Sequence, residues 1–193
     1  MRTLLLLGGM TPDVTGLYYD ITNRAARSAL GGRHNAPLYV YSANLEAMVQ
    51  YAGAGDWDNL VKAYTNPVDA LSDKVDVVVS LSPTGVPLPH IADCVAVHLK
   101  SRYPQVRTVG LLEEVNRGMM NEVSKGAAAV TPQTKAMFIR QANKLIKRGA
   151  QGIILGSTDL GFVVRLENFD DGVIIIKLGA IHAEEAAKWA LRN

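Results

Sequence analysis

Short runs of apolar residues alternate along the chain with longer stretches in which apolar residues recur at a helical period. The apolar runs are continuous, which is typical of parallel strands that helices cover on both faces. Glycine, proline or small polar residues bound each run. The pattern therefore predicts an α/β protein with a mostly parallel sheet. The predicted strands cover residues 3–7, 38–42, 75–81, 107–112, 152–155 and 173–177.

The stretches between the strands predict helices. The first begins after Thr11, whose hydroxyl suits an N-cap, with Pro12 at the first helical position, and two consecutive glycines end it. In the second we expect a kink or break at Pro67, because proline has no backbone N–H to donate. Its inward positions are Trp57, Leu60, Val61 and Tyr64. Further helices are predicted over residues 90–101, 131–147 and 180–191.

The chain shows a weak internal correspondence. One predicted strand runs into Ser82-Pro83-Thr84-Gly85, and a later one into Gly156-Ser157-Thr158-Asp159. Open α/β sheets place ligands beyond the carboxyl ends of their strands, so two pseudo-symmetric halves facing one cleft would bring Ser82 and Ser157 together. No linker separates the halves. We therefore expect a single domain of 193 residues made of two intimately packed lobes, about 1–105 and 106–193.

Composition excludes several classes of protein. With 48% apolar residues and a net charge of +2, the chain is neither disordered nor strongly basic, and its 20 Lys and Arg residues form no stripe that would track nucleic acid. No apolar run approaches the ~20 residues that cross a membrane, and the run at residues 4–7 is too short for a signal peptide. A single cysteine, Cys94, forms no internal disulfide, so we expect a cytoplasmic protein.

The turn between the first strand and the first helix, Gly8-Gly9-Met10-Thr11, is a candidate anion site. Backbone amides at the start of a helix suit a carboxylate or a phosphate. The glycine spacing matches neither dinucleotide-binding nor Walker motifs, so a nucleotide is not indicated. A tight turn with no ligand is an equally open interpretation.

Four segments carry motifs that fit together. They are Gly8-Gly9-Met10-x-Pro12, Ser42-Ala43-Asn44-Leu45-Glu46, Gly149-Ala150-x-Gly152-Ile153-Ile154-Leu155-Gly156-Ser157-Thr158-Asp159 and Ile181-His182-Ala183. Together they resemble the aspartate/glutamate/hydantoin racemase superfamily, with its GGMGP-like turn, its G-A-D-x-I-I-L-G-C-T-E motif and its terminal I-H-A. The resemblance implies a parallel-sheet racemase-like fold of two pseudo-symmetric halves and a small-molecule substrate bearing a carboxylate or carbonyl. It also implies chemistry without a cofactor.

In that family the substrate sits between two cysteines, one from a C-N-T motif and one from the G-C-T motif. The resemblance places Ser82-Pro83-Thr84 and Gly156-Ser157-Thr158 at these motifs, so both cysteines are serines here. A thiol of reference pKa ~8.5 becomes a usable thiolate, whereas a serine hydroxyl needs an adjacent base. Racemisation of amino acids by two thiols is therefore not expected.

Two other departures concern the substrate and the origin of the serines. The segment between Leu112 and Gly149 is shorter than in such a racemase, which favours a substrate of another size or shape than an amino acid. An ordinary cysteine racemase carrying two Cys→Ser replacements is a further interpretation. Pro83 and the shorter segment argue against it, because neither follows from such replacements.

Few residues remain for acid–base work. His182 is the first candidate, because imidazole titrates near neutrality, and Asp159 is the second. The alternatives are a helix-terminus hydrogen bond for His182 and an N-cap or a positioning role for Asp159. Cys94 with His90 could form a nucleophilic pair, but a buried core cysteine is favoured, and solvated charge is favoured for Glu113-Glu114. No spacing of His, Cys or Asp indicates a metal.

The leading hypothesis is a cofactor-independent isomerase, or a decarboxylase-type lyase, that forms an enolate-like intermediate. Catalysis would fall to His182, Asp159, Ser82 and Ser157, and substrate binding to Met10, Thr11, Asn44, Thr84 and Thr158. The hydroxyls and amides among these residues would hold the oxyanion. The alternative hypothesis is a non-catalytic protein that binds a small carboxylate. A homodimer stays open, since superfamily relatives are often dimers.

Overall fold

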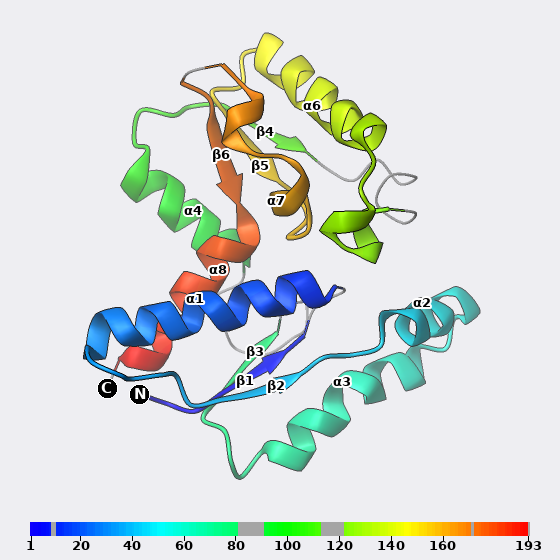
Figure 1. The fold of residues 1–193 in the computed structure, drawn as a ribbon, viewed down its shortest axis with the longest axis vertical. Helices are drawn as coiled ribbons and strands as arrows, with labels where there is room; N and C mark the ends of the chain where they lie inside the picture. Colours follow the sequence, from blue (N-terminus) through cyan, green and yellow to red (C-terminus); the bar gives the residue numbers. More distant parts are fainter. Residues whose placement is uncertain (9–10, 81–90, 113–121, 171, 193) are drawn as a thin grey trace. The chain divides into compact units, whose positions relative to one another are not determined.

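The computed structural model describes residues 1–8, 11–80, 91–112, 122–170 and 172–192 (Figure 1). The chain divides into two compact units. Unit 1 consists of Met1–Leu88 together with Ala183–Asn193, and unit 2 of Pro89–His182. Among the described residues, no helix combines the length and the apolar character that a membrane span requires.

Unit 1 contains a parallel three-stranded sheet in the order β2-β1-β3. Its strands are β1 (Leu4–Leu7), β2 (Leu38–Tyr41) and β3 (Val77–Ser80). Leu7 pairs with Tyr41 on one side and with Ser80 on the other, so the three strands end at the same edge. The side chains of β1 are buried throughout, as the continuous apolar run predicted.

Helix α1 (Pro12–Leu30) follows the predicted bounds. The Thr11 hydroxyl caps it by accepting a hydrogen bond of 3.4 Å from the Val14 amide, and Gly31, at a φ of 74°, ends it. Tyr18, fully buried, belongs to the core face. A backbone N–H at the first helical position has no partner within the helix, and Pro12 has no N–H to leave unpaired. This is why Thr11-Pro12 predicts the start of the helix so clearly.

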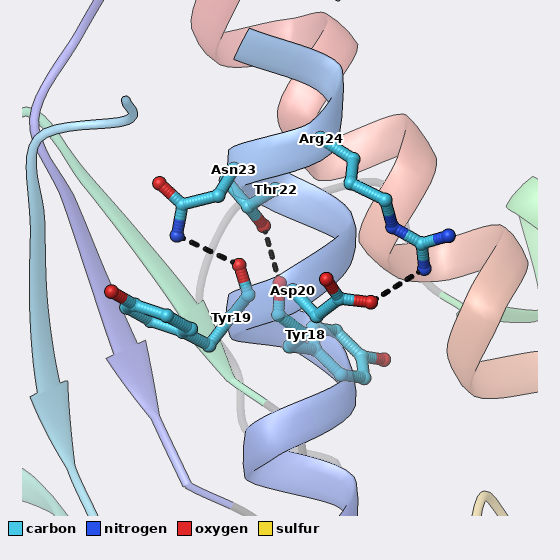
Figure 2. A network of polar contacts seen from close by, with 6 residues as sticks. All are labelled: Tyr18, Tyr19, Asp20, Thr22, Asn23 and Arg24. Carbon is cyan, nitrogen blue, oxygen red and sulfur yellow. Dashed lines mark hydrogen bonds and ion pairs between the residues drawn. The ribbon is translucent and has the colours of Figure 1, made fainter. Parts of the chain in front are cut away.

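Polar side chains of α1 bond to groups about one turn away in the same helix (Figure 2), and one of them also holds the chain that follows the helix. The side-chain amide of Asn23 donates to the Tyr19 carbonyl at 2.9 Å, and its Oδ1 accepts the backbone N–H of Ala36 at 3.1 Å. Thr22 Oγ1 donates to the Tyr18 carbonyl at 2.7 Å. The buried Asn23 thus holds the segment that leads into β2.

Two helices lie between β2 and β3. Helix α2 (Leu45–Ala54) was not predicted. Helix α3 (Trp57–Leu71) continues through Pro67, so a break there is wrong, and the alternative of a kink stays a prediction. Proline removes one intrahelical hydrogen bond, but the hydrogen bonds of the residues before and after it maintain the helix. The inward placement of Trp57 and Val61 is also wrong, since they are 61% and 54% exposed. The helical period located the helix but not the face that is covered.

Unit 2 contains a second parallel sheet in the order β4-β5-β6. Its strands are β4 (Val109–Leu112), β5 (Gly152–Leu155) and β6 (Ile174–Lys177), and Leu155 pairs with Leu112 and with Lys177. Each sheet therefore pairs its first strand in parallel with the strand that precedes a Ser-Thr segment, β1 with β3 and β4 with β5. The predicted α/β class with parallel sheets is confirmed.

The two faces of the unit 2 sheet pack against different helices. Helices α6 (Pro132–Lys147) and α7 (Leu160–Val163) share one apolar cluster with β5, which includes Phe138, Ile153 and Leu155. Helix α4 (Ile91–Arg102) supplies Cys94 to the other cluster, which Ile176 and Ile181 complete. Cys94 is only 4% exposed, so its predicted burial in the core is confirmed, whereas a pairing with His90 involves a residue outside the described part of the chain.

Helix α8 (Leu178–Leu191) belongs to both units, because the division between them falls between His182 and Ala183. Within unit 1, the Arg2 amide donates to the Ala190 carbonyl at 3.0 Å, and the Arg2 guanidinium lies 4.3 Å from the centre of the Trp189 ring. Residues 183–193 thus belong to unit 1. The predicted second lobe, in contrast, comprised residues 106–193 without interruption. The intimate packing of the lobes stays a prediction.

Candidate functional site

In both units the candidate residues follow strands at the carboxyl edge of the sheet. In unit 1, Asn44 comes shortly after β2, and Thr11 lies where α1 begins. In unit 2, Ser157 and Thr158 follow β5, and Lys177 ends β6. Ligands of open α/β sheets bind at this edge, so the four predicted residues among these lie where a ligand could bind, and their roles in binding stay predictions.

In unit 1 the candidate side chains also hold the local fold. Thr11 is 1% exposed, its hydroxyl caps α1, and its carbonyl accepts a hydrogen bond of 3.3 Å from Thr15 Oγ1. The exposed Asn44 caps α2, since its Oδ1 accepts from the Glu46 amide at 3.0 Å. The side-chain N–H groups of Asn44 bond to no residue that the structure describes. Asn44 therefore keeps donors for a ligand.

In unit 2 the segment after β5 is a hydrogen-bonded turn. The Gly156 amide donates to the Leu112 carbonyl at 2.8 Å and thus extends the β4–β5 pairing by one bond. Ser157 Oγ accepts the backbone N–H of Asp159 at 3.4 Å, and the Asp159 carbonyl accepts from the Phe162 amide at 3.0 Å. Ser157 and Thr158 are half-buried, so a ligand at this edge could reach their hydroxyls.

The two acid–base candidates are buried. Asp159 is 3% exposed and His182 is 6% exposed, and neither is without an interaction partner. Asp159 occupies the N-cap position of α7, but its side chain makes no capping bond there. His182 lies inside α8, which begins at Leu178 and not at residue 180 as predicted. Both residues lie in unit 2.

Lys177 is a polar residue at the carboxyl edge that the sequence reasoning missed. It is exposed at the end of β6, beside Leu155 of β5. A Cβ built on Gly161 would lie 3.8 Å from its Cδ and 3.9 Å from its Cγ, so the lysine stem runs past the first turn of α7. The rule that pointed to Ser157, a polar residue at the end of a buried strand, would also have found Lys177.

Several predicted residues lie outside the described part of the chain. They include Met10, Ser82 and Thr84, together with His90 and Glu113-Glu114. The prediction that Ser82 faces Ser157 across a cleft therefore stays a prediction. His34, expected in solvent, is exposed. Within the ranges that the structure describes, no three His, Cys, Asp or Glu side chains are grouped so that they could hold a metal ion.

Comparison with known proteins supplies the family context. No family model matches the chain. Among solved structures, the chain is similar to a candidate Asp/Glu racemase from Yersinia pestis, with 27% identity, a TM-score of 0.79 and 100% coverage of both chains. It is also similar in fold to an aspartate racemase homologue from Pyrococcus horikoshii OT3, with 22% identity, a TM-score of 0.72 and 100% coverage of both. The similarity spans the full length of each chain.

Proposed function

We propose that the chain is a member of the aspartate/glutamate racemase superfamily, because it shares the fold of two such proteins along its whole length, and from this premise we infer a function. The protein is an isomerase, or a decarboxylase-type lyase, that needs no cofactor and works on a small molecule. It moves a proton at the carbon next to a carboxylate or carbonyl group. It does not racemise amino acids with two thiols, because serine stands at both thiol positions.

The environment of Ser157 is the observation that carries this proposal. Its Oγ accepts one backbone N–H, from Asp159, and bonds to no histidine or carboxylate among the described residues. A serine hydroxyl without an adjacent base is neither a base nor a nucleophile at neutral pH. It still donates a hydrogen bond, so its role in the proposal is to stabilise an oxyanion.

The proton carriers in the proposal are His182 and Asp159. In the isomerase reaction, one of them takes the proton from the carbon, and the electron pair of the C–H bond moves into the carbonyl to give an enolate. A proton then returns to the carbon. In the lyase reaction, the C–C bond to a carboxylate breaks, carbon dioxide leaves, and the electron pair forms the same enolate, which takes up one proton. The hydroxyls of Ser157 and Thr158 hold the enolate oxygen.

The test is deuterium incorporation into carbon acids. The protein is dialysed against EDTA and incubated in heavy water with 2-oxo acids, 3-oxo acids and malonates, and proton NMR follows exchange and decarboxylation. We expect at least one compound to exchange or to lose carbon dioxide in the wild type. The rate should fall about 100- to 10,000-fold in His182→Asn or in Asp159→Asn, because a positioned general acid or base typically contributes that factor.

Two results would contradict the proposal. One is turnover that both substitutions leave unchanged. The other is saturable binding of these carboxylates with no exchange and no decarboxylation, which would indicate a non-catalytic carboxylate-binding protein. A circular dichroism spectrum of each variant is the matched control, since both replaced side chains are buried.

A further inference from the structure

We propose that Lys177 binds the carboxylate of the substrate at the carboxyl edge of the unit 2 sheet. This inference rests on the proposed function, because it concerns the anionic group of the same substrate. It adds a residue that neither the internal correspondence nor the family motifs indicated. Three observations carry it: the register of β6, the path of the lysine stem, and the charge around it.

The register places Lys177 beside the hydroxyl-bearing turn. Lys177 pairs with Leu155, and both are the last residues of their strands. Neighbouring strands lie ~4.8 Å apart, and Ser157 is two residues beyond Leu155. The lysine and the two hydroxyls of Ser157 and Thr158 thus leave the sheet at one edge, from adjacent strands.

The path of the side chain follows from strand alternation. Val173 and Ile175 pack against the apolar cluster that includes α7, and Lys177 is the next residue on that side. Its Cγ and Cδ pass Gly161, where an added Cβ would make only ordinary contact. The apolar stem therefore lies along α7 while the charged end reaches solvent, as long lysine side chains commonly do.

The charge of Lys177 is uncompensated within the described part of the chain. The two ion pairs there join Arg24 to Asp20 and Lys188 to Glu185, and Lys177 takes part in neither. A lysine ammonium acts as a compact positive charge with three donors, which suits a carboxylate oxygen. With hydroxyl donors on the adjacent turn, this edge offers a carboxylate both charge and hydrogen bonds.

The experiment measures binding of succinate by isothermal titration calorimetry to the whole protein. Lys177→Met keeps the length and apolar contact of the stem but removes the charge, and Lys177→Arg restores a charge. Lys147→Met is the matched control, because Lys147 is also an exposed lysine of unit 2, but it precedes β5 and so lies at the opposite edge. Succinamide, the neutral analogue, is titrated in parallel.

We expect succinate to bind the wild type and Lys147→Met alike, and to bind Lys177→Met about 10- to 100-fold more weakly, as the loss of a charged hydrogen bond implies. Lys177→Arg should recover part of the affinity, and succinamide should not distinguish the variants. Equal weakening in Lys147→Met and Lys177→Met would overturn the inference, as would unchanged succinate binding in Lys177→Met or no binding in the wild type.

The outcome separates this inference from the proposed function. If succinate binding depends on Lys177 but no carbon acid exchanges deuterium, the carboxylate site stands and the catalytic proposal fails. If carbon acids exchange while Lys177→Met leaves succinate binding and KM unchanged, the catalytic proposal stands and the role of Lys177 fails. Equal thermal unfolding midpoints of the two methionine variants show that the difference lies in binding.

Discussion

The backbone amide of Gly8 donates a hydrogen bond of 2.7 Å to the carbonyl oxygen of Tyr41. This bond extends the pairing of β1 and β2 by one residue, at the edge where the first motif begins. A Cβ on Gly8 would lie 2.6 Å from that same oxygen and 3.0 Å from Thr15 Oγ1. A larger residue than glycine would clash at this position, because β1, β2 and α1 come close together around it.

Gly8→Ala should lower the free energy of unfolding by about 1–3 kcal/mol, the usual cost of forcing an extra group into a packed site. Urea denaturation followed by circular dichroism measures it. The matched control is Gly16→Ala on α1, where an added Cβ meets nothing within 4 Å. That substitution should stabilise the protein by about 0.5–1 kcal/mol, because alanine favours a helix interior. Equal changes in unfolding free energy for the two substitutions would contradict the interpretation that an added Cβ clashes at Gly8.

Glu122 links the segment before α6 to the cap of that helix. Its Oε2 accepts the backbone N–H of Thr131 at 2.7 Å. This bond, with a further one from the Thr134 side chain, holds the pKa of the Glu122 carboxyl below its ordinary value of 4.5. Since Thr131 is the N-cap of α6, the ionised carboxylate stabilises the start of the helix.

The stability that Glu122 contributes should therefore depend on pH in a defined direction. A carboxyl whose pKa is lowered in the folded state stabilises that state fully above 4.5, and the contribution disappears as the pH falls through the lower folded value. The unfolding free energy of Glu122→Gln should thus lie below that of the wild type at pH 7, with the gap closing in acid. Denaturation curves from pH 7 to pH 2.5 check this, with the exposed Glu167→Gln as control. A gap that widens in acid would contradict it.

Aspartate and glutamate should keep their α protons in the presence of this protein. The reason is the serine at positions 82 and 157, since neither hydroxyl has the acidity of a thiol. Proton NMR of either amino acid in heavy water measures the exchange. Ready exchange would mean that a hydroxyl is activated here, or that another base removes the α proton.

The pH dependence of the rate should separate the role of His182 from that of Ser157. With a substrate in hand, His182→Asn should remove a limb of the pH–rate profile near neutrality, because imidazole titrates there. Ser157→Ala should lower the rate about 100- to 1,000-fold and leave the shape of the profile unchanged, as the loss of one oxyanion donor does. An unaltered rate and profile in His182→Asn would refute its role and turn attention to Asp159.

The six strands that the structure describes, and the bounds of α1 and α6, were predictable because their signals are local. Continuous apolar runs mark strands that are covered on both faces, and Thr11-Pro12 and Thr131-Pro132 each combine a capping hydroxyl with a proline at the first helical position. These features depend on neighbours a few residues away. The local sequence is therefore sufficient to predict these strands and helix starts.

Features that depend on distant parts of the chain were missed. Which face of α3 is buried depends on the elements that pack against it. Trp57 and Val61 were therefore predicted to be buried from their helical spacing alone, but they are exposed. The sequence predicted the strand β6. It did not predict that Lys177, at the end of that strand, lies beside Leu155, because that pairing depends on the order of the strands in the sheet. Likewise, Arg2 and Trp189 meet across nearly the whole sequence, and no local pattern predicts that contact.

The split of α8 between the two units has a consequence for synthesis on the ribosome. Unit 2 is contiguous, whereas unit 1 is completed only by residues 183–193, which are made after the last residue of unit 2. The earlier-made part of unit 1 must therefore wait for a segment that follows all of unit 2. During translation the sheet of β1, β2 and β3 lacks the anchor that Arg2 finds at Trp189 and Ala190. Unit 1 thus begins to emerge from the ribosome first, but unit 2 is the first to be complete.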